Sequence, residues 1–266
     1  MSTIGGITEI ERYRTGRGPC SYLWHETASL ECRVISDITS EAYRDLLQRG
    51  WRRFGRDFFR PACPRCTKCR SLRIKIREFA PSRSQRRAVE SNQHVEVVVQ
   101  PLTISPAHVK LYNDYHLFMH AQRGWRLGQT TKQEYATTFL AGNFAFAREI
   151  LYFAARKLVG VALIDLVPGA VSSVYFFHDP AWRPKAPGVF SVLQTLKVGQ
   201  DHDLEHQYLG YWIKECPSMA YKGKYRPHEL LQFYPSDEEE PTWRDPGIRK
   251  CIKNQIHASV DTNERP

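Results

Sequence analysis

The chain has 266 residues and a formal net charge of +10, with 42% hydrophobic and 12% aromatic residues. This length and balance suit a globular protein of one large domain or two small ones. No apolar run approaches the roughly 20 residues of a membrane span, and the N-terminus lacks the apolar stretch of a secretory signal. We therefore expect a cytoplasmic protein with no membrane partner.

The positive charge is concentrated between residues 52 and 87. This segment holds 13 basic and two acidic residues, a net charge of +11, so the rest of the chain sums to −1. Eleven of the 13 bases are arginine, which favours bidentate phosphate contacts. Such a basic block indicates a phosphate-backbone partner, with a solvated, solubilising face as the alternative.

The first expected elements lie in this front half of the chain. Residues 39–50 predict a short helix, because Thr39 or Ser40 can cap its start and Gly50 can end it. Residues 71–79 alternate apolar and basic side chains, which predicts a strand with one charged face. Residues 84–92 predict a basic helix.

The back half predicts two helices, a set of strands and a third helix. Ser105 and Pro106 begin a helix, and Thr131 with Glu134 forms a capping box for the next one. Three strands follow at 150–155, 158–167 and 171–177, joined by tight turns. A loop rich in proline leads to a helix over about 188–204, and a strand over 206–212 comes next.

This order of elements predicts an α+β fold with an antiparallel meander, as in acetyltransferase-like (GNAT-like) domains. We expect a basic, cysteine-containing N-terminal domain over 1–87 and a GNAT-like catalytic domain over 88–234. Residues 235–266 are polar and punctuated by proline, which predicts a loose C-terminal tail.

Several sequence blocks resemble the leucyl/arginyl-tRNA–protein transferase family, and they occur in family order. The front half carries Cys20-Ser-Tyr22-Leu, GWRRFGRDFFRPAC at 50–63, CRSLRIKI at 69–76 and FAPSRSQRR at 79–87. The back half carries VGVALIDLVPGAVSSVYFFHDP at 159–180, YLGYWIKEC at 208–216 and MAYKGKYRP at 219–227. The resemblance covers roughly residues 17–232.

The resemblance implies acyl transfer from an aminoacyl-tRNA to the N-terminal amine of a protein, which marks that protein for degradation through the N-degron pathway. In length and in its CxxCxxC the chain is similar to the bacterial aspartate/glutamate leucyltransferase type, which moves Leu to N-terminal Asp or Glu. An arginyl transferase is the alternative. The implied partners are a charged tRNA and a protein with an acidic N-terminus, and we expect a monomer. The residues expected to contact the tRNA are Arg52, Arg53, Arg73, Arg83, Arg86 and Arg87.

The implied reaction must take a proton from an α-amine with a pKa of about 8, stabilise an oxyanion and protonate the leaving ribose oxygen. Asp165 lies in an otherwise apolar strand and is the catalytic candidate for handling the ammonium group. Tyr175, near the end of the next strand, is the candidate for a hydrogen bond to the carbonyl or the leaving oxygen. The alternatives are an Asp that closes its strand at Pro168 and an aromatic core residue.

An acceptor with an acidic N-terminal residue brings a carboxylate, which calls for Arg or Lys. Lys222 and Arg226, with Tyr221 beside them, are the candidates for binding it, and a plain surface patch is the alternative. A leucyl donor needs an apolar pocket, to which strand alternation lets one face of 206–212 contribute. The expected lining residues, with core packing as the alternative, are Tyr208, Tyr211 and Trp212.

The loop over 183–188 argues against CoA as the acyl donor. CoA-dependent proteins of the acetyltransferase-like fold bind pyrophosphate in this loop through backbone N–H groups. Pro184 and Pro187 have no N–H, and Ala186 replaces a glycine of the CoA-binding pattern. An alternative of another class is a non-catalytic, metal-containing nucleic-acid-binding protein, which would not consume aminoacyl-tRNA.

The seven cysteines do not indicate a disulfide framework, because their number is odd and the expected compartment is reducing. Three closely spaced cysteines plus a remote one resemble iron–sulfur ligation. The eukaryotic arginyl members of the family bind a cluster with cysteines of this region, although position 23 here is Leu. A cluster, zinc and no metal all stay open, and the acyl transfer itself needs no cofactor. The candidate ligands are Cys20, Cys63, Cys66 and Cys69.

Overall fold

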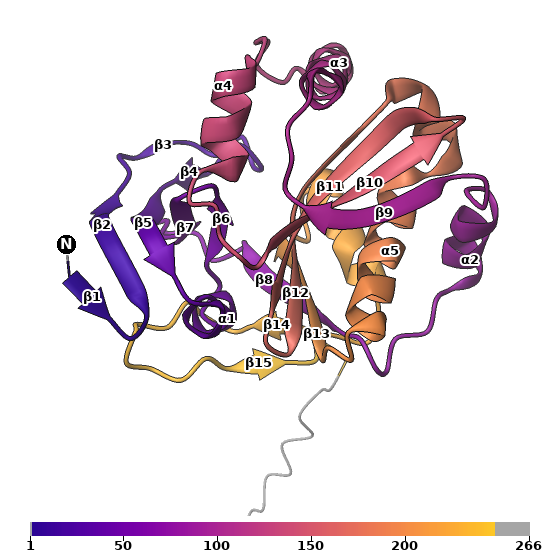
Figure 1. Ribbon diagram of the computed structural model, residues 1–266. Coiled ribbons are helices and arrows are strands. Elements are labelled where there is room, and N and C mark those ends of the chain that lie inside the picture. Colours follow the sequence, from indigo (N-terminus) through magenta and orange to yellow (C-terminus); the bar gives the residue numbers. More distant parts are fainter. Residues whose placement is uncertain (1, 248–266) are drawn as a thin grey trace, which may run out of the picture.

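The computed structural model describes residues 2–247 and contains two main sheets (Figure 1). The N-terminal sheet has the strand order β1-β2-β5-β7-β6. Helix α1 (Ser40–Gln48) covers it with four buried residues, Ala42, Tyr43, Leu46 and Leu47. The strands are β1 (Ser2–Ile4), β2 (Ile7–Arg14), β5 (Leu30–Ile38), β6 (Arg52–Phe54) and β7 (Asp57–Pro61). A small hairpin, β3 (Gly18–Pro19) with β4 (Thr27–Ala28), connects β2 to β5.

The second sheet is larger, with the strand order β15-β14-β8-β13-β12-β11-β10-β9. Its neighbours pair antiparallel except β12 and β13, which run parallel. The strands are β8 (Arg70–Lys75), β9 (Glu96–Pro101), β10 (Ala147–Ala154), β11 (Lys157–Val167), β12 (Ala170–His178), β13 (His206–Trp212), β14 (His228–Leu231) and β15 (Trp243–Arg244).

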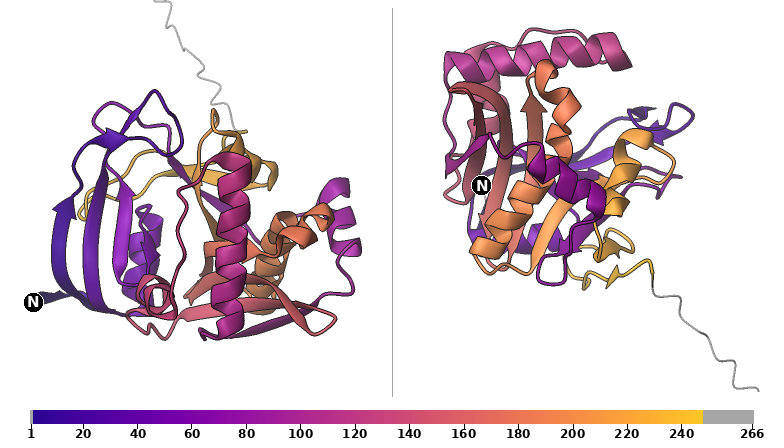
Figure 2. Two further views of the ribbon diagram at one scale, coloured as in Figure 1. Left: turned by 90° about the horizontal axis from the view of Figure 1, so that it is seen from above. Right: turned by 90° about the vertical axis from the view of Figure 1, so that its right-hand side faces the viewer.

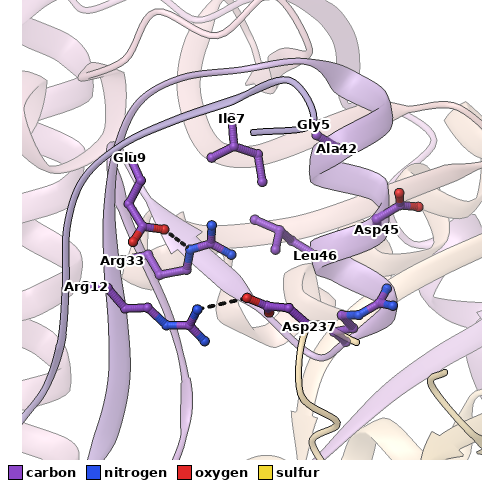
Figure 3. Close-up of a pocket in the computed structure, with 10 residues that line it drawn as sticks. Gly5, Ile7, Glu9, Arg12, Arg33, Ala42, Asp45, Leu46 and Asp237 are labelled. Carbon is purple, nitrogen blue, oxygen red and sulfur yellow. Dashed lines mark hydrogen bonds and ion pairs between the residues drawn. The ribbon is translucent and has the colours of Figure 1, made fainter. Parts of the chain in front are cut away.

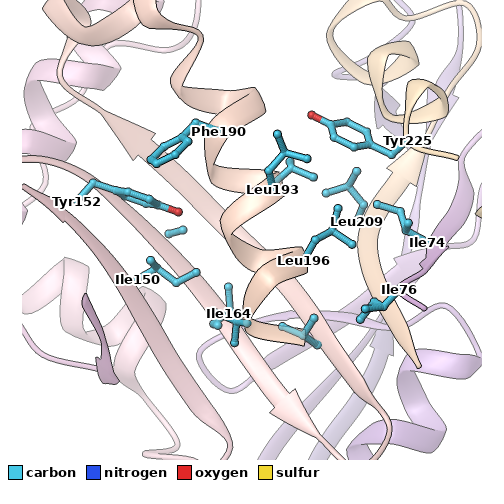
Figure 4. Packing of buried hydrophobic residues seen from close by; sticks show 14 of the residues in the cluster. Ile74, Ile76, Ile150, Tyr152, Ile164, Phe190, Leu193, Leu196, Leu209 and Tyr225 are labelled. Atoms are coloured by element: carbon cyan, nitrogen blue, oxygen red, sulfur yellow. The ribbon is translucent and has the colours of Figure 1, made fainter. Parts of the chain in front are cut away.

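Helices cover both faces of the large sheet. Helix α5 (Pro187–Asp201) packs Phe190, Leu193 and Leu196 against Ile150 and Ile164 of the strands (Figure 4). Helix α2 (Arg83–Glu90) lies beside α5. The other face carries α3 (Pro106–Arg123), α4 (Lys132–Tyr135) and the π-helical turn η1 (Ala136–Leu140). Seen from above, α3 stands in projection between the N-terminal sheet and the α5–α2 pair (Figure 2, left).

The chain order β9, α3, α4, β10, β11, β12, α5, β13 confirms the predicted α+β, GNAT-like architecture. The predicted caps also form: Thr39 caps α1, Ser105 caps α3, and Thr131 with Glu134 makes the capping box of α4. Each expected strand and helix lies within a few residues of its predicted position. Within residues 2–247, no helix is both long and apolar enough to cross a membrane.

The segment before the predicted boundary at residue 87 contributes to both sheets, and the boundary itself stays a prediction. Strand β8 and helix α2 come from the predicted N-terminal domain, yet β8 lies between β13 and β14 in the large sheet. Its apolar residues Leu72 and Ile74 are fully buried there. The N-terminal sheet therefore ends at Pro61, and the segment from 70 onward belongs to the larger unit.

The prediction of a loose tail is wrong for residues 235–247, and residues 248–266 lie outside the described part. This segment crosses back under the N-terminal sheet as a strap (Figure 1). Asp237 pairs with Arg12 at 2.8 Å, and the Pro235 carbonyl accepts from Arg60 at 2.7 Å. The Trp243 indole donates to the Gln48 carbonyl at 3.1 Å. These contacts bind the polar strap to the arginine-rich sheet.

A buried ion pair joins the two sheets. Asp165 of β11 is fully buried, and both its oxygens accept from Arg53 of β6, with the Arg53 Nε at 3.1 Å. The Tyr43 hydroxyl of α1 donates to the same carboxylate at 2.9 Å. A carboxylate inside an apolar strand needs such partners, because burying it alone would be strongly unfavourable.

Replacing Arg53 by Met is expected to lower the free energy of unfolding by about 3–5 kcal/mol, because the Asp165 carboxylate is left buried without its cation. Urea denaturation measures this change. The control is Arg77→Met, which breaks an exposed pair with Asp203 and should cost at most about 1 kcal/mol. Equal losses in the two variants would show that the buried pair does not hold the sheets together.

Candidate active site

The backbone pairing of β12 with β13 stops partway along the strands, and we call the region between the two strands beyond Ser172 and Tyr208 the wedge. Their parallel pairing runs from Ala170–His206 to Ser172–Tyr208 and ends there. Both strands carry a register shift at this level. The β11–β12 register passes from Ser173 to Tyr175, and the β8–β13 register passes from Tyr208 to Gly210. Bulges bend a strand and expose backbone polar groups, so this is a natural place for a polar ligand.

Arg52 of β6 reaches into the wedge from the N-terminal sheet. Its side chain is 8% exposed, and its Nη2 donates to the Ser173 carbonyl. Gln207 donates from Nε2 to the Ser173 hydroxyl at 3.0 Å. Several buried atoms around these contacts have no protein partner, namely Arg52 Nη1, Ser172 Oγ and Gln207 Oε1. An unpaired buried polar atom costs about 1–3 kcal/mol, so the wedge offers donors and acceptors to a polar ligand.

Lys222 closes the wedge from the side of β13. It lies in the 3-10 turn η3 (Tyr221–Lys224), which follows the short helix α6 (Pro217–Ala220). Its Nζ donates to the Tyr211 carbonyl at 2.9 Å. Burial, together with the nearby charge of Arg52, lowers the pKa of Lys222 to about 7. A lysine in this state exchanges a proton readily at neutral pH.

Gly210 lies close to both of these cations. Its φ is +81°, and a Cβ at this position would lie in ordinary van der Waals contact, 3.4 Å from Lys222 Nζ and 3.9 Å from Arg52 Nε. A side chain here would therefore strain the backbone at the point where the strand faces both groups. The glycine inside the predicted strand 206–212 was the sequence signal for this bulge.

An aromatic wall flanks the wedge on the β12 side. The Tyr175 hydroxyl lies 2.9 Å from His116 Nε2 of α3. Burial raises the pKa of Tyr175 and lowers that of His116, so both groups are neutral at pH 7. Rings of Phe54, Tyr112 and Phe139 pack around Tyr175. The wall combines an apolar surface with one neutral hydrogen-bonding pair. His116 was not identified from the sequence.

The structure brings together only part of the predicted substrate site. Lys222 lies at the wedge, and Tyr221 is 39% exposed beside it. Trp212 donates from its indole to the Ala220 carbonyl at 3.2 Å and so supports the segment that carries Lys222. Arg226 is exposed at the start of β14, and no contact among the described residues joins it to Lys222.

Tyr208 and Tyr211 do not line the wedge, which differs from their predicted role. Tyr208 faces a separate cavity of 500 Å³ at the closed end of the strand pair and lies 3.4 Å from Arg73. The Tyr211 hydroxyl donates to the Phe59 carbonyl at 3.1 Å and thereby ties β13 to the N-terminal sheet. The Asp165 carboxylate likewise does not line the wedge, since Arg53 and Tyr43 donate hydrogen bonds to its oxygens.

The six arginines expected to contact tRNA divide into two groups. Arg83, Arg86 and Arg87 are exposed on α2. Arg52 and Arg53 are buried, and Arg73 pairs with Glu229 at 2.7 Å while lying over the Trp243 ring. The guanidinium groups of Arg52, Arg53 and Arg73 each donate to a carboxylate or carbonyl of the chain, so α2 is the better candidate for phosphate contacts, and the tRNA role of these three arginines stays a prediction.

The candidate metal ligands are neighbours, but they do not form a ready-made site. Burial and the nearby thiolates of Cys20, Cys63 and Cys66 raise the pKa of Cys69 to about 12. However, the Cys63 thiol is directed at the Ser29 carbonyl, 3.6 Å away. Within residues 2–247, no group of three or more potential ligands is arranged to hold a metal ion. The four cysteines therefore stay candidate ligands, and no step of the chemistry is assigned to a metal or cluster.

A further cavity of 390 Å³ lies far from the wedge, between α1 and the strands β2 and β5 (Figure 3). Arg12 and Arg33 point into it and pair with Asp237 and Glu9. Ile7 and Leu46 form its apolar side. Because its cations already have carboxylate partners from the chain itself, this cavity is not the candidate active site.

The order of strands and helices in the large sheet is that of an acetyltransferase-like domain. Two family models match the chain: "Arginine-tRNA-protein transferase, N terminus" over residues 18–87 and "Arginine-tRNA-protein transferase, C terminus" over residues 107–232. The chain therefore belongs to the family of aminoacyl-tRNA–protein transferases.

Curated relatives cover most of the chain. A protein of Helicobacter hepaticus named "Aspartate/glutamate leucyltransferase" is 38% identical over 224 residues, which is 84% of this chain and 93% of that protein. One of Campylobacter jejuni with the same name is 37% identical over 213 residues, covering 80% and 89%. Among solved structures, the crystal structure of FemX matches with a TM-score of 0.42 at 9% identity, covering 77% of this chain and 79% of FemX.

Replacing Gly210 by Ala is expected to lower both stability and transfer activity, because a φ of +81° is strained for alanine and the strand that faces Lys222 and Arg52 must shift to relieve the strain. Gly169→Ala is the matched control, since Gly169 has φ +71° but open space around it. Both variants should lose about 1 kcal/mol or more in thermal denaturation. Only Gly210→Ala should also lose transfer activity, and equal activities would argue against the wedge.

Proposed function

We propose that this enzyme transfers leucine from leucyl-tRNA to the N-terminal amine of proteins that begin with Asp or Glu, and that the wedge carries the reaction. The observation that supports this best is that Lys222 and Arg52 both lie close to Gly210 and that the charge of Arg52 helps to lower the pKa of Lys222. The names of the curated relatives support leucine as the donor residue and Asp or Glu as the acceptor. A charged tRNA in turn supports the cytoplasmic location expected from the sequence.

Lys222 is assigned the proton transfer. In its neutral form it takes a proton from the acceptor α-ammonium, and the free amine then attacks the ester carbonyl carbon. The Lys222 ammonium so formed lies beside the oxyanion and stabilises it. When the bond between the acyl carbon and the ribose oxygen breaks, this proton passes to the ribose oxygen, and the attacking nitrogen releases its second proton to solvent to leave a neutral amide. The products are a new peptide bond and deacylated tRNA, and no covalent enzyme intermediate is needed.

Tyr175 is assigned a hydrogen bond to the ester. Because burial raises its pKa, the phenol keeps its proton and acts as a neutral donor, held by His116 at 2.9 Å. The leucyl side chain lies against the aromatic wall of Phe54, Tyr112 and Phe139. The sequence-based role of Asp165 as a proton acceptor gives way to a positioning role, because its carboxylate is occupied.

Arg52 is assigned the binding of the acceptor's side-chain carboxylate. Its Nη1 is buried without a partner, and guanidinium is always charged, so it suits a second carboxylate better than a half-neutral lysine does. This replaces the sequence-based roles of Lys222 and Arg226 in binding that carboxylate. Tyr221, exposed beside Lys222, can contact the acceptor chain.

The exposed face of α2 is assigned to the tRNA backbone. Arg83, Arg86 and Arg87 are solvent-accessible, and the Asn92 amide just beyond α2 donates to the Lys185 carbonyl at 2.7 Å. This places Lys185 and the turn η2 (Pro180–Lys185), which leads into α5, next to the basic helix. Pro187 at the first position of α5 offers no N–H, so this loop does not resemble a pyrophosphate site for CoA.

The iron–sulfur cluster or zinc predicted on Cys20, Cys63, Cys66 and Cys69 stays a prediction outside this mechanism. A visible spectrum with iron and zinc analysis of anaerobically purified protein decides it. The monomeric state expected from the sequence also stays a prediction.

The donor and acceptor are tested by incubating the protein with Leu-tRNA or Arg-tRNA and peptides beginning with Asp, Glu, Arg or Lys. Leucine should be added to the Asp and Glu peptides only. Transfer of arginine in place of leucine would reassign the donor, and absence of transfer from either tRNA would overturn the function.

Lys222→Met is expected to reduce the transfer rate by about 10²- to 10⁴-fold, because the proton acceptor is lost. In the wild type the lysine is protonated below its pKa of about 7, so activity should rise as the pH increases through this value. The matched control is Lys224→Met, an exposed lysine of the same turn, which should keep the wild-type rate and pH profile. A Lys222→Met profile with an unchanged inflection would assign the proton transfer to another group.

Arg52→Gln is expected to reduce the preference for N-terminal Asp over Asn by about 10- to 100-fold, since a charge-assisted hydrogen bond is removed. The ratio of kcat/KM for the two peptides is the readout, because losses of folded protein cancel in it. An unchanged ratio would move the acceptor carboxylate to another residue.

A further inference from the structure

Trp24 stands out in the connection between β3 and β4. Its side chain is 91% exposed, well above the next exposed large apolar residue within residues 2–247, Leu117 at 58%. The mechanism proposed above does not use it. A tryptophan this exposed has both faces of its ring and its indole N–H available to a partner.

The connection that presents Trp24 is held in one shape. The Cys20 amide donates to the Glu26 carbonyl at 3.0 Å, and the Glu26 amide donates to the Leu23 carbonyl at 2.9 Å. Lys68 pairs with the Glu26 carboxylate at 3.0 Å. Leu23, next to Trp24, is 5% exposed. An aromatic ring presented on a fixed support loses little conformational entropy when it binds a partner.

The support of this connection is continuous with the wedge. Leu23 packs against Ile213 and Cys216 in one buried cluster. Cys216 immediately precedes helix α6, which leads to Lys222, and its thiol is close enough to influence the Lys222 pKa. Trp24 therefore directly follows a residue that packs against the segment leading to Lys222.

The surroundings of Trp24 suit a nucleic acid better than an apolar protein surface. Its ring meets the His25 ring edge-on at 5.4 Å. Arg17 and Arg65 are exposed on the neighbouring segments, and the one acid of the connection, Glu26, is already paired with Lys68. An exposed aromatic ring near basic groups is an arrangement by which proteins stack single-stranded bases.

We propose that Trp24 stacks on an unpaired base of the 3′ single strand of the donor tRNA and thereby holds the aminoacyl end at the wedge. The proposal rests on the proposed function, since it takes aminoacyl-tRNA as the donor. Stacking does not depend on which amino acid is attached, so Trp24 acts on the RNA alone.

The test measures binding of uncharged tRNA to the full chain. Because uncharged tRNA carries no aminoacyl group, this measurement does not depend on the transfer reaction. Two RNAs are compared: intact tRNA and the same tRNA trimmed of its unpaired 3′ nucleotides. Trp24→Ala should weaken binding of the intact tRNA by about 5- to 150-fold and leave the trimmed tRNA unaffected. Trp24→Tyr should retain most of the affinity, since it also offers a ring.

Two matched variants define the comparison. Arg86→Gln removes a backbone contact from α2 and should weaken both RNAs alike. Phe233→Ala removes another exposed ring, 50% exposed, and should change neither. Equal affinity of Trp24→Ala and wild type for intact tRNA would overturn the proposal, as would an equal loss for both RNAs. A change only in KM for the acceptor peptide would also overturn it. Failure of the transfer assay with normal tRNA stacking would instead count against the proposed function.

Discussion

The pairing of Asp165 with Arg53 is the constraint on which the rest of the site depends. It sets β6 of the N-terminal sheet against β11 of the large sheet, with the Tyr43 hydroxyl completing the carboxylate's hydrogen bonds. Arg52 is the next residue along β6, and strand alternation sends its side chain to the other side of the strand. Because Arg53 is fixed by a buried charge, Arg52 is fixed as well, and it enters the wedge at Ser173. The catalytic unit is thus built from both sheets.

Desolvation gives the wedge its chemistry. The β12–β13 pairing ends beside two register shifts, and Gly210 of β13 lies close to Lys222 and Arg52. In that small space Arg52 cannot lose its charge, so the cost of burial falls on Lys222, whose pKa is lowered to about 7. In the proposed mechanism the charged Arg52 holds a carboxylate, while Lys222 exchanges a proton. The same physical effect keeps Tyr175 and His116 neutral.

Much of the fold could be predicted from the sequence, because periodicity and caps are local signals. The helix capped by Thr131 and the strand over 206–212 are examples. Which charged residues become buried could not be predicted from the sequence, since burial depends on which strands become neighbours. Arg53 and Arg86 belong to one basic block, yet one is inside an ion pair and the other is exposed on α2. The strap over 235–247 was missed for the same reason: its acidic residues are ordered by arginines from the opposite end of the chain.

The most direct test of the account is a structure of the enzyme with leucyl-adenosine in which an amide replaces the ester. The account predicts the acyl carbonyl in the wedge, with its carbon near Lys222 Nζ and its leucyl side chain against Tyr175 and Phe139. The same structure with an Asp-initiated peptide should place the acceptor carboxylate on Arg52. An acyl group bound instead in the cavity between α1 and β2, or on the far face of the large sheet, would contradict the assignment of the wedge as the active site.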